Sequence, residues 1–218
     1  MIQHPASMSS RWLLAAVLAI FFSLVILPSA ALQGSKAAAG GESQSDSATQ
    51  RIQEYLSRAE KALMADKLTE TGELLRQAIL IQWSITPLKI ENLVHVQQEP
   101  TFYGDVALQH GKRYSPNEVL RLYLEPRYYS IREYDDLYST HLTVDVKLIL
   151  EDGTIAFHDP RLIDYEIEGT QPNLEIYMDI TFNLGPGIPP GEHAVEIELI
   201  DQLSGEKTTT QTLFEFEH

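Results

Sequence analysis

The sequence predicts a mainly β protein: an antiparallel β-sandwich over residues 88–218, preceded by a short αα-hairpin over residues 49–83. Two patterns of apolar residues predict this fold. In the C-terminal segments apolar and polar residues alternate, which is typical of strands with one buried and one solvent-facing side. Between residues 49 and 83 the apolar residues instead recur every three or four positions, which is typical of helices with one packed face.

The first 31 residues are apolar and contain no acidic residue. Arg11 precedes an uncharged run over residues 12–27, and Pro28 ends that run before three small residues. A basic residue, a long apolar core and a small-residue exit predict a secretory signal peptide over residues 1–31. With residues 28–31 included, the run is also long enough for an uncleaved signal anchor in the inner membrane. Both interpretations place residues 32–218 outside the cytoplasm, in the periplasm or the extracellular space.

Composition narrows the classes of partner. Residues 32–48 are rich in Ala, Gly, Ser and Gln and are predicted to form a flexible linker. The chain has 16 basic and 31 acidic residues, so a surface of this kind repels phosphate backbones, and nucleic acid is not an expected partner. Membrane contact is expected only through residues 12–31, if that segment is not cleaved. The absence of cysteine excludes disulfides, a thiol nucleophile and a lipidated cysteine.

Two amphipathic helices account for residues 49–83. The apolar positions of the first are Ile52, Tyr55, Leu56, Ala59, Ala62 and Leu63, and those of the second are Leu74, Leu75, Ala78 and Ile79. Thr69 is a plausible N-cap for the second helix. Because only a few residues separate the two helices, we expect them to pack antiparallel.

The run from Ala62 to Thr69, followed by Ala78, resembles a tetratricopeptide-like hairpin of bacterial exported or membrane-tethered proteins. It differs at Gly72, near where such hairpins often carry proline, and no second copy follows at the repeat period. A single repeat of this kind cannot bury its own apolar face. We therefore expect the hairpin either to cap the following sandwich or to dock onto a partner protein.

Strand-like alternation is most regular over residues 142–150, 174–184 and 195–199. Shorter candidate strands cover residues 93–97, 119–125, 154–158, 163–167 and 208–217. Turn sequences at Asp152-Gly153, at residues 185–191 and at residues 204–206 separate them. Seven or eight short strands with turns at these intervals predict an immunoglobulin-like sandwich.

Residues 188–206, followed by a Thr-rich strand ending at Phe216, resemble the last two strands of bacterial extracellular Ig-like domains. His193 stands where those domains often carry a tyrosine, and the cysteine pair of antibody-type domains is missing. With the hairpin, the whole resembles uncharacterised exported bacterial proteins in which a tetratricopeptide-like hairpin precedes an Ig-like β-sandwich. That resemblance implies a fold and brings no activity with it.

No motif in the sequence predicts catalysis. There is no nucleophile elbow, no phosphate-binding loop and no EF-hand, and the histidines outside the first 31 residues are widely spread. His141 and Asp145 lie on one face of a predicted strand, where we expect a surface contact between polar side chains. We therefore expect no enzymatic activity, no metal site and no cofactor.

A tyrosine-rich segment, residues 123–138, is the strongest candidate for binding. Tyrosine and arginine offer a large contact area with polar ends, a composition favoured at recognition surfaces. The candidate binding residues are Tyr128, Tyr129, Arg132, Tyr134 and Tyr138. The alternative is that Tyr128, Tyr129 and Tyr134 only pack a hairpin against the sandwich or beneath the helices.

These observations together predict a non-enzymatic, exported protein–protein interaction module, periplasmic or envelope-associated, with a protein partner in the envelope. The alternative is a β-sandwich that binds a glycan or a peptide, in which several of the tyrosines of residues 123–138 would line an exposed groove.

Overall fold

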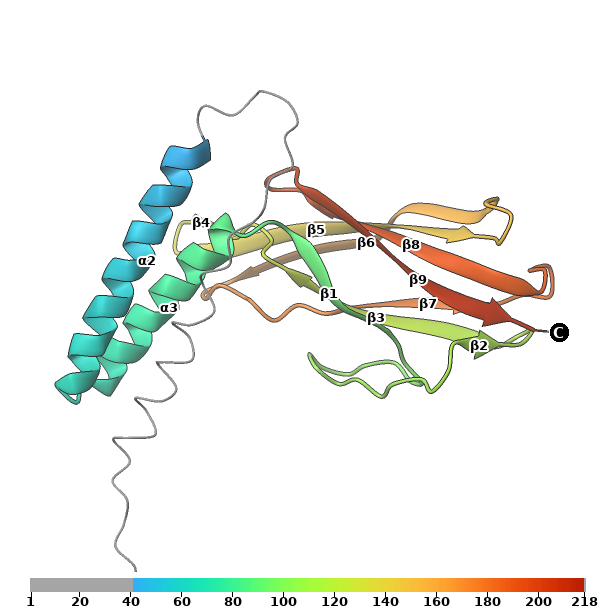
Figure 1. Cartoon of the computed structure of the whole chain (residues 1–218), viewed down its shortest axis with the longest axis horizontal. Coiled ribbons are helices and arrows are strands. Elements are labelled where there is room, and N and C mark those ends of the chain that lie inside the picture. Colours follow the sequence, from blue (N-terminus) through green and yellow to red (C-terminus); the bar gives the residue numbers. More distant parts are fainter. Residues whose placement is uncertain (1–40, 218) are drawn as a thin grey trace, which may run out of the picture. The chain divides into compact units, whose positions relative to one another are not determined.

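A computed structural model describes residues 41–217, so the predicted signal segment and most of the predicted linker lie outside the described residues. Two helices, α2 (Gly41–Met64) and α3 (Leu68–Ile85), precede nine strands within this range (Figure 1). The strands are β1 (Lys89–His95), β2 (Arg113–Tyr114), β3 (Val119–Arg127), β4 (Arg132–Tyr134), β5 (Leu137–Ile149), β6 (Ile155–Gly169), β7 (Met178–Asn183), β8 (Gly191–Asp201) and β9 (Lys207–Phe216).

The strands form two sheets. The first has the order β1-β3-β7, and the second has the order β2-β9-β8-β5, with β4 and β6 both pairing with β5. All pairs are antiparallel except the two-residue pairing of β2 with β9. The chain crosses between the sheets several times, whereas β4, β5 and β6 follow one another within the second sheet, as do β8 and β9. The two antiparallel sheets form a sandwich of the immunoglobulin-like kind. The predicted mainly β fold, with an αα-hairpin before the sandwich, is confirmed.

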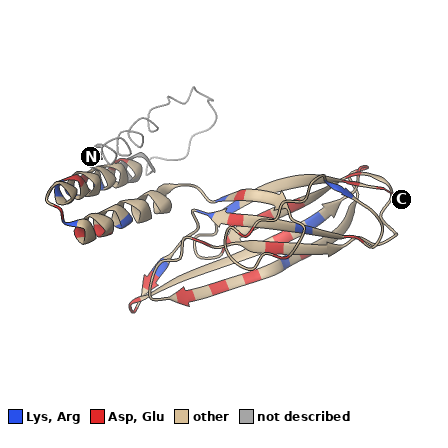
Figure 2. Ribbon diagram, turned by 90° about the horizontal axis from the view of Figure 1, so that it is seen from below, with Lys and Arg blue, Asp and Glu red and all other residues tan. Residues whose placement is uncertain are grey.

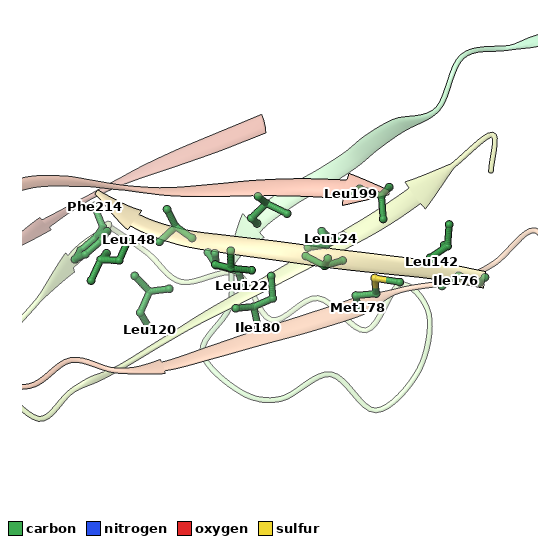
Figure 3. Close-up of a cluster of buried hydrophobic side chains, with 14 of the residues drawn as sticks. Leu120, Leu122, Leu124, Leu142, Leu148, Ile176, Met178, Ile180, Leu199 and Phe214 are labelled. Atoms are coloured by element: carbon green, nitrogen blue, oxygen red, sulfur yellow. The ribbon is translucent and has the colours of Figure 1, made fainter. Parts of the chain in front are cut away.

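The inward-facing side chains of both sheets form one apolar core (Figure 3). Leu120, Leu122 and Leu124 of β3 have no exposed surface, and they alternate with outward-facing residues along the strand. The facing sheet contributes fully buried residues from β5 and β8, namely Leu142, Val144, Val146, Val195, Ile197 and Leu199. Burying one such side chain contributes about 1.5–3 kcal/mol, so this layer is the main source of stability.

The helices form the predicted hairpin with different ends. Helix α2 begins at Gly41, so the predicted boundary between linker and hairpin at residue 49 is wrong. Once a helix is nucleated, each further residue adds a hydrogen bond, and polar residues can therefore extend it without an apolar face. Thr69 is not the N-cap of α3: the cap position is Lys67, which makes no capping hydrogen bond through its side chain. Asp66, with φ of 57°, forms the turn between the helices.

Trp83 attaches the end of α3 to the sandwich. Its indole Nε1–H donates to the backbone oxygen of Tyr129 at 2.8 Å, and its ring meets the rings of Tyr128 and Tyr129 edge-on at 5.0 and 5.1 Å. The side chain is buried in the sandwich core. The hairpin is thus joined to the sandwich by a packed aromatic contact in addition to the chain itself.

The structure differs from the predictions at strands β2, β4, β6 and β7. Residues 154–158 and 163–167, predicted as two strands, belong to the single strand β6, because an edge strand accommodates Pro160 within a bulge. In the predicted strand 174–184, the structure has β7 only from Met178 onward. The short strands β2 and β4 were not predicted, since two or three residues carry no measurable alternation.

His193 joins two loops at one end of the sandwich. It lies near the start of β8, is buried, and contacts the backbone oxygen of Pro189 through Nε2 at 2.7 Å. The N–H of Glu151 donates to Nδ1 at 3.1 Å, so Nε2 carries the proton and donates to Pro189. The histidine therefore holds the β7–β8 corner and the β5–β6 turn together.

We expect His193→Phe to lower the free energy of unfolding by about 1–3 kcal/mol, because it leaves the Glu151 N–H and the Pro189 oxygen without this partner. The phenyl ring preserves the edge-on contact that His193 makes with Phe214 at 5.5 Å. Urea unfolding followed by tryptophan fluorescence measures the difference. His193→Gln, which keeps a donor and an acceptor, is the control and should lose less. Equal stability of all three proteins would contradict this role.

His95 joins the two sheets where β1, β2 and β9 approach one another. Its Nδ1 contacts the Tyr114 hydroxyl at 2.8 Å and its Nε2 contacts the Thr212 hydroxyl at 3.0 Å, and the ring is buried. Burial, with a smaller contribution from the charge of Lys112, lowers the pKa of His95 to about 4. The imidazole is therefore neutral in the folded protein at neutral pH.

This lowered pKa predicts a loss of stability in acid. Between pH 6.5 and about 4 the unfolded chain protonates His95 and the folded protein does not. The contribution is therefore fully present above pH 6.5, and it falls with decreasing pH by at most about 1.4 kcal/mol per pH unit. Urea unfolding of the wild type and His95→Gln across this range measures the difference. Parallel pH profiles for the two proteins would contradict the assignment.

Candidate functional site

Of the five predicted binding residues, Tyr129 packs inside the protein and Tyr128 is half-buried. The Tyr129 side chain is only 1% exposed, and its hydroxyl donates to the backbone oxygen of Asn173 at 2.8 Å. Burial raises the pKa of Tyr129 well above its usual value. Tyr128 is half-buried between Trp83 and Lys89, whose Nζ lies 5.2 Å from the ring centroid. The prediction that Tyr129 contacts a partner is thus corrected, because its side chain belongs to the core.

The other three predicted residues lie on the β4–β5 hairpin. Tyr134 is 73% exposed, Tyr138 is half-buried, and Arg132 donates from Nη2 to the backbone oxygen of Leu203 at 3.4 Å. Asp135 and Asp136 form the turn with φ of 50° and 64°. Desolvation, followed by the charge of nearby Glu133, raises the pKa of Tyr138. The structure therefore does not bring the five predicted residues together on one surface.

A larger exposed surface lies on the helical hairpin. The core of the hairpin is small, consisting of Ala59, Ala62 and Leu74 with Tyr55 packed against it. Met64 and Leu68, beside the turn, are 77% and 65% exposed, and Ile79 is 50% exposed. A hairpin that buries mainly alanine leaves its larger apolar side chains in contact with solvent.

Six apolar side chains, four exposed and two half-buried, form one stripe on each helix, and Met64 lies outside both stripes. The stripe of α2 contains Ile52, Leu56 and Leu63, and the stripe of α3 contains Leu68, Leu75 and Ile79. Spacings of four and seven residues bring side chains to one side of a helix. On each helix, the stripe is rotated about the helix axis by about a quarter turn from the side that is buried against the other helix. The rotation has the same sense on both helices when each is viewed along its own chain direction. Because the helices are antiparallel, both stripes lie on the same side of the hairpin, which we call the hairpin face.

A buried carboxylate lies on the outer side of the first sheet. Glu125 of β3 is 4% exposed and accepts hydrogen bonds from the hydroxyls of Tyr123 (2.8 Å) and Tyr103 (3.0 Å) and from Nδ2 of Asn92 (2.9 Å). The guanidinium of Arg127 lies 3.5 Å from the same carboxylate. Four donors, one of them the positively charged guanidinium, compensate the burial of this acidic group.

The segment 97–112 covers this carboxylate. Tyr103 reaches Glu125 from the segment, and the N–H of Gly104 donates to the Tyr123 hydroxyl at 2.9 Å. At the base of the segment, backbone hydrogen bonds join Gln97 to Ala107 and Gln109 to His95. An open hollow of about 420 Å³ remains beside it, lined by Asn92, Val94, Gly104, Val106, Leu108 and Glu125. All donors around Glu125 are already paired with it, so the carboxylate holds the segment and is not free for a ligand.

Sequence reasoning missed this network. Glu125 occupies an outward-facing position of an alternating strand, and such a position is normally exposed to solvent. The only available signal was the pair Tyr123 and Glu125 on the same side of one strand. The segment that buries them was not assigned a role.

We expect Glu125→Gln to loosen the segment 97–112, because one amide oxygen cannot accept the donors that two carboxylate oxygens accept. Limited chymotrypsin digestion should cleave faster after Phe102, which is 63% exposed. Glu99→Gln, on the same segment but outside the network, is the matched control and should be cleaved at the wild-type rate. Unchanged cleavage of the Glu125 variant would show that the carboxylate does not hold the segment.

The predicted surface contact of His141 exists, with a different partner. Its Nε2 lies 2.7 Å from Asp164 of the neighbouring strand β6, while Asp145 accepts the backbone N–H of Arg161. Within residues 41–217 no group of three or more metal-binding side chains comes together. No helix in this range has the length and apolar content needed to cross a membrane.

No protein-family model and no curated protein matches this sequence. Solved structures with partial similarity include a family 123 glycoside hydrolase from Clostridium perfringens (TM-score 0.37, 11% identity, 60% of this chain and 27% of that chain). The PKD domain of an M14-like peptidase from a Thermoplasmatales archaeon has a TM-score of 0.33 and 6% identity over 61% of this chain and 94% of that chain. The sporulation control protein Spo0M from Bacillus subtilis has a TM-score of 0.32 and 16% identity over 61% of this chain and 50% of that chain. This chain therefore spans about a quarter of the hydrolase, and none of these similarities bears on activity or partners.

Proposed function

We propose that this chain is a non-enzymatic protein–protein interaction module, exported to the periplasm or the cell envelope, and that the hairpin face binds its protein partner. The observation that carries the proposal is the hairpin face itself. Six apolar side chains lie on one side of two helices whose own core is mostly alanine. Exposed apolar patches of this kind mark interaction sites more often than isolated apolar residues do.

The attachment of the hairpin supports the same proposal. Trp83 joins α3 to the sandwich near the C-terminal end of that helix, at Tyr128 and Tyr129. Leu68 and Ile79 nevertheless remain at least half exposed. The sandwich therefore provides a base for the hairpin while the hairpin face stays accessible, as a docking element requires.

Glycan or peptide binding through the tyrosine-rich segment receives less support. That function requires several of its tyrosines to line an exposed groove. Tyr129 is in the core and Tyr128 is partly covered by Trp83, so Tyr134 is the one exposed tyrosine among the five candidate binding residues.

A charge placed on the hairpin face tests the proposal. We expect Ile79→Glu to reduce the recovery of a crosslinked envelope partner at least tenfold, because the new carboxylate would lose its water in the complex. The measurement is quantitative mass spectrometry of proteins crosslinked to the tagged full chain in the envelope fraction.

Leu213→Glu is the matched control, since Leu213 is a similarly exposed apolar residue on β9. Circular dichroism should show that both variants keep the wild-type helix and strand content. Equal loss of the partner in both variants, or no loss in either, would contradict binding through the hairpin face.

A further inference from the structure

Strand β6 has a free edge. It pairs with β5 along its length, and no other strand within residues 41–217 pairs with it. Its unpaired backbone N–H and C=O groups on the other edge are a template for one more strand. Protein domains of several kinds bind extended peptides by adding them to such an edge.

A bulge limits the usable length of this edge. Val144 pairs with Ile163 and Val146 pairs with Asp159, so three residues of β6 lie opposite one residue of β5. The bulge contains Pro160 and Arg161, whose φ is 66°. Beyond it, residues 163–169 pair with β5 in unbroken register. This regular stretch, which we call the β6 edge, is long enough to pair with a short extended segment.

A hollow with both apolar and acidic lining lies beside the β6 edge. Its volume is about 420 Å³, and it is lined by Ile163 and Tyr165 of β6 and by residues 175–179, the last two of which begin β7. Glu175 and Asp179 are the acidic members of this lining, and Ile176 and Met178 are apolar. Elsewhere along the same two strands, Phe157 and Phe182 close the space between the sheets with an edge-on ring contact at 5.7 Å. A strand added to the β6 edge would place every second side chain over this hollow.

The opposite side of the β6 edge is acidic. Asp164, Glu166 and Glu168 alternate with the inward-facing residues, and Figure 2 shows acidic positions recurring along the strands. Asp164 contacts His141 and lies 3.6 Å from Arg161. Neither Glu166 nor Glu168 has an ion-pair partner among the described residues. The other side chains of an added strand would therefore lie beside uncompensated carboxylates.

We propose that the β6 edge binds an extended segment of a partner protein in which apolar residues alternate with Lys or Arg. Side chains of adjacent strands that share a face lie about 5 Å apart. The apolar residues of the segment enter the hollow beside Tyr165, and its basic residues pair with Glu166 and Glu168. Backbone hydrogen bonds along the edge supply affinity, and the alternation supplies specificity.

A second copy of this chain does not fit the same edge. Antiparallel pairing of two β6 edges would place rows of carboxylates on neighbouring strands, and like charges in such positions are destabilising. The formal charge of −15 per chain adds long-range repulsion between copies. A basic segment relieves this charge, so the electrostatics select a partner of opposite sign.

The test uses the full chain and synthetic peptides that alternate valine and lysine over seven residues. We expect the alternating peptide to bind and to slow amide hydrogen exchange in residues 163–169. Glu166→Lys combined with Glu168→Lys should weaken binding at least tenfold. Glu60→Lys combined with Glu192→Lys changes the net charge equally, on α2 and β8, and should leave binding unchanged.

Three outcomes would overturn the proposal. Equal binding of a peptide with the same composition in separate valine and lysine blocks would indicate attraction by net charge alone. Protection of residues 163–169 before peptide is added would show that the edge is covered, by residues 1–40 in a monomer or by a second copy in a dimer seen by sedimentation. If no peptide binds, the carboxylates of Asp164, Glu166 and Glu168 would serve only to prevent other strands from pairing with this edge. Ile79→Glu should bind the peptide normally, so this result is independent of the hairpin face.

Discussion

The apolar layer between the two sheets is the constraint on which the rest of the structure depends. Leu120, Leu122 and Leu124 of β3 all point into it and are fully buried. Because side chains alternate along a strand, this fixes Tyr123, Glu125 and Arg127 on the opposite side. The segment 97–112 covers the carboxylate on this outer face: its Tyr103 hydroxyl donates to Glu125, and its Gly104 N–H donates to the hydroxyl of Tyr123, which in turn donates to Glu125.

The same layer leaves two surfaces incomplete. The sandwich closes over its own core and contacts the hairpin through Trp83, and the apolar side of the hairpin remains exposed. The second sheet is wider than the first, and its outermost long strand, β6, has no neighbour on one edge among residues 41–217. One surface is apolar and helical, and the other is an acidic strand edge. The two proposed binding surfaces therefore differ in chemistry.

The sequence alone determined the elements that depend on local periodicity. Alternation over residues 142–150 predicted the buried face of β5, and three- and four-residue spacing predicted both helices. The turn at residues 185–191 was also predictable, because it depends on a short segment. These features need only the geometry of one strand, one helix or one turn.

Only the tertiary structure decided what covers each face. Whether Glu125 is exposed depends on a segment that begins earlier in the chain and folds back over β3, and Tyr129 is buried because Trp83, 46 residues away in sequence, packs onto it. The free edge of β6 depends likewise on the sheet order, which places β8 on the other side of β5. The spacing of apolar residues along the sequence shows which residues share one side of a helix or strand. It carries no information about which distant segment of the chain packs against that side.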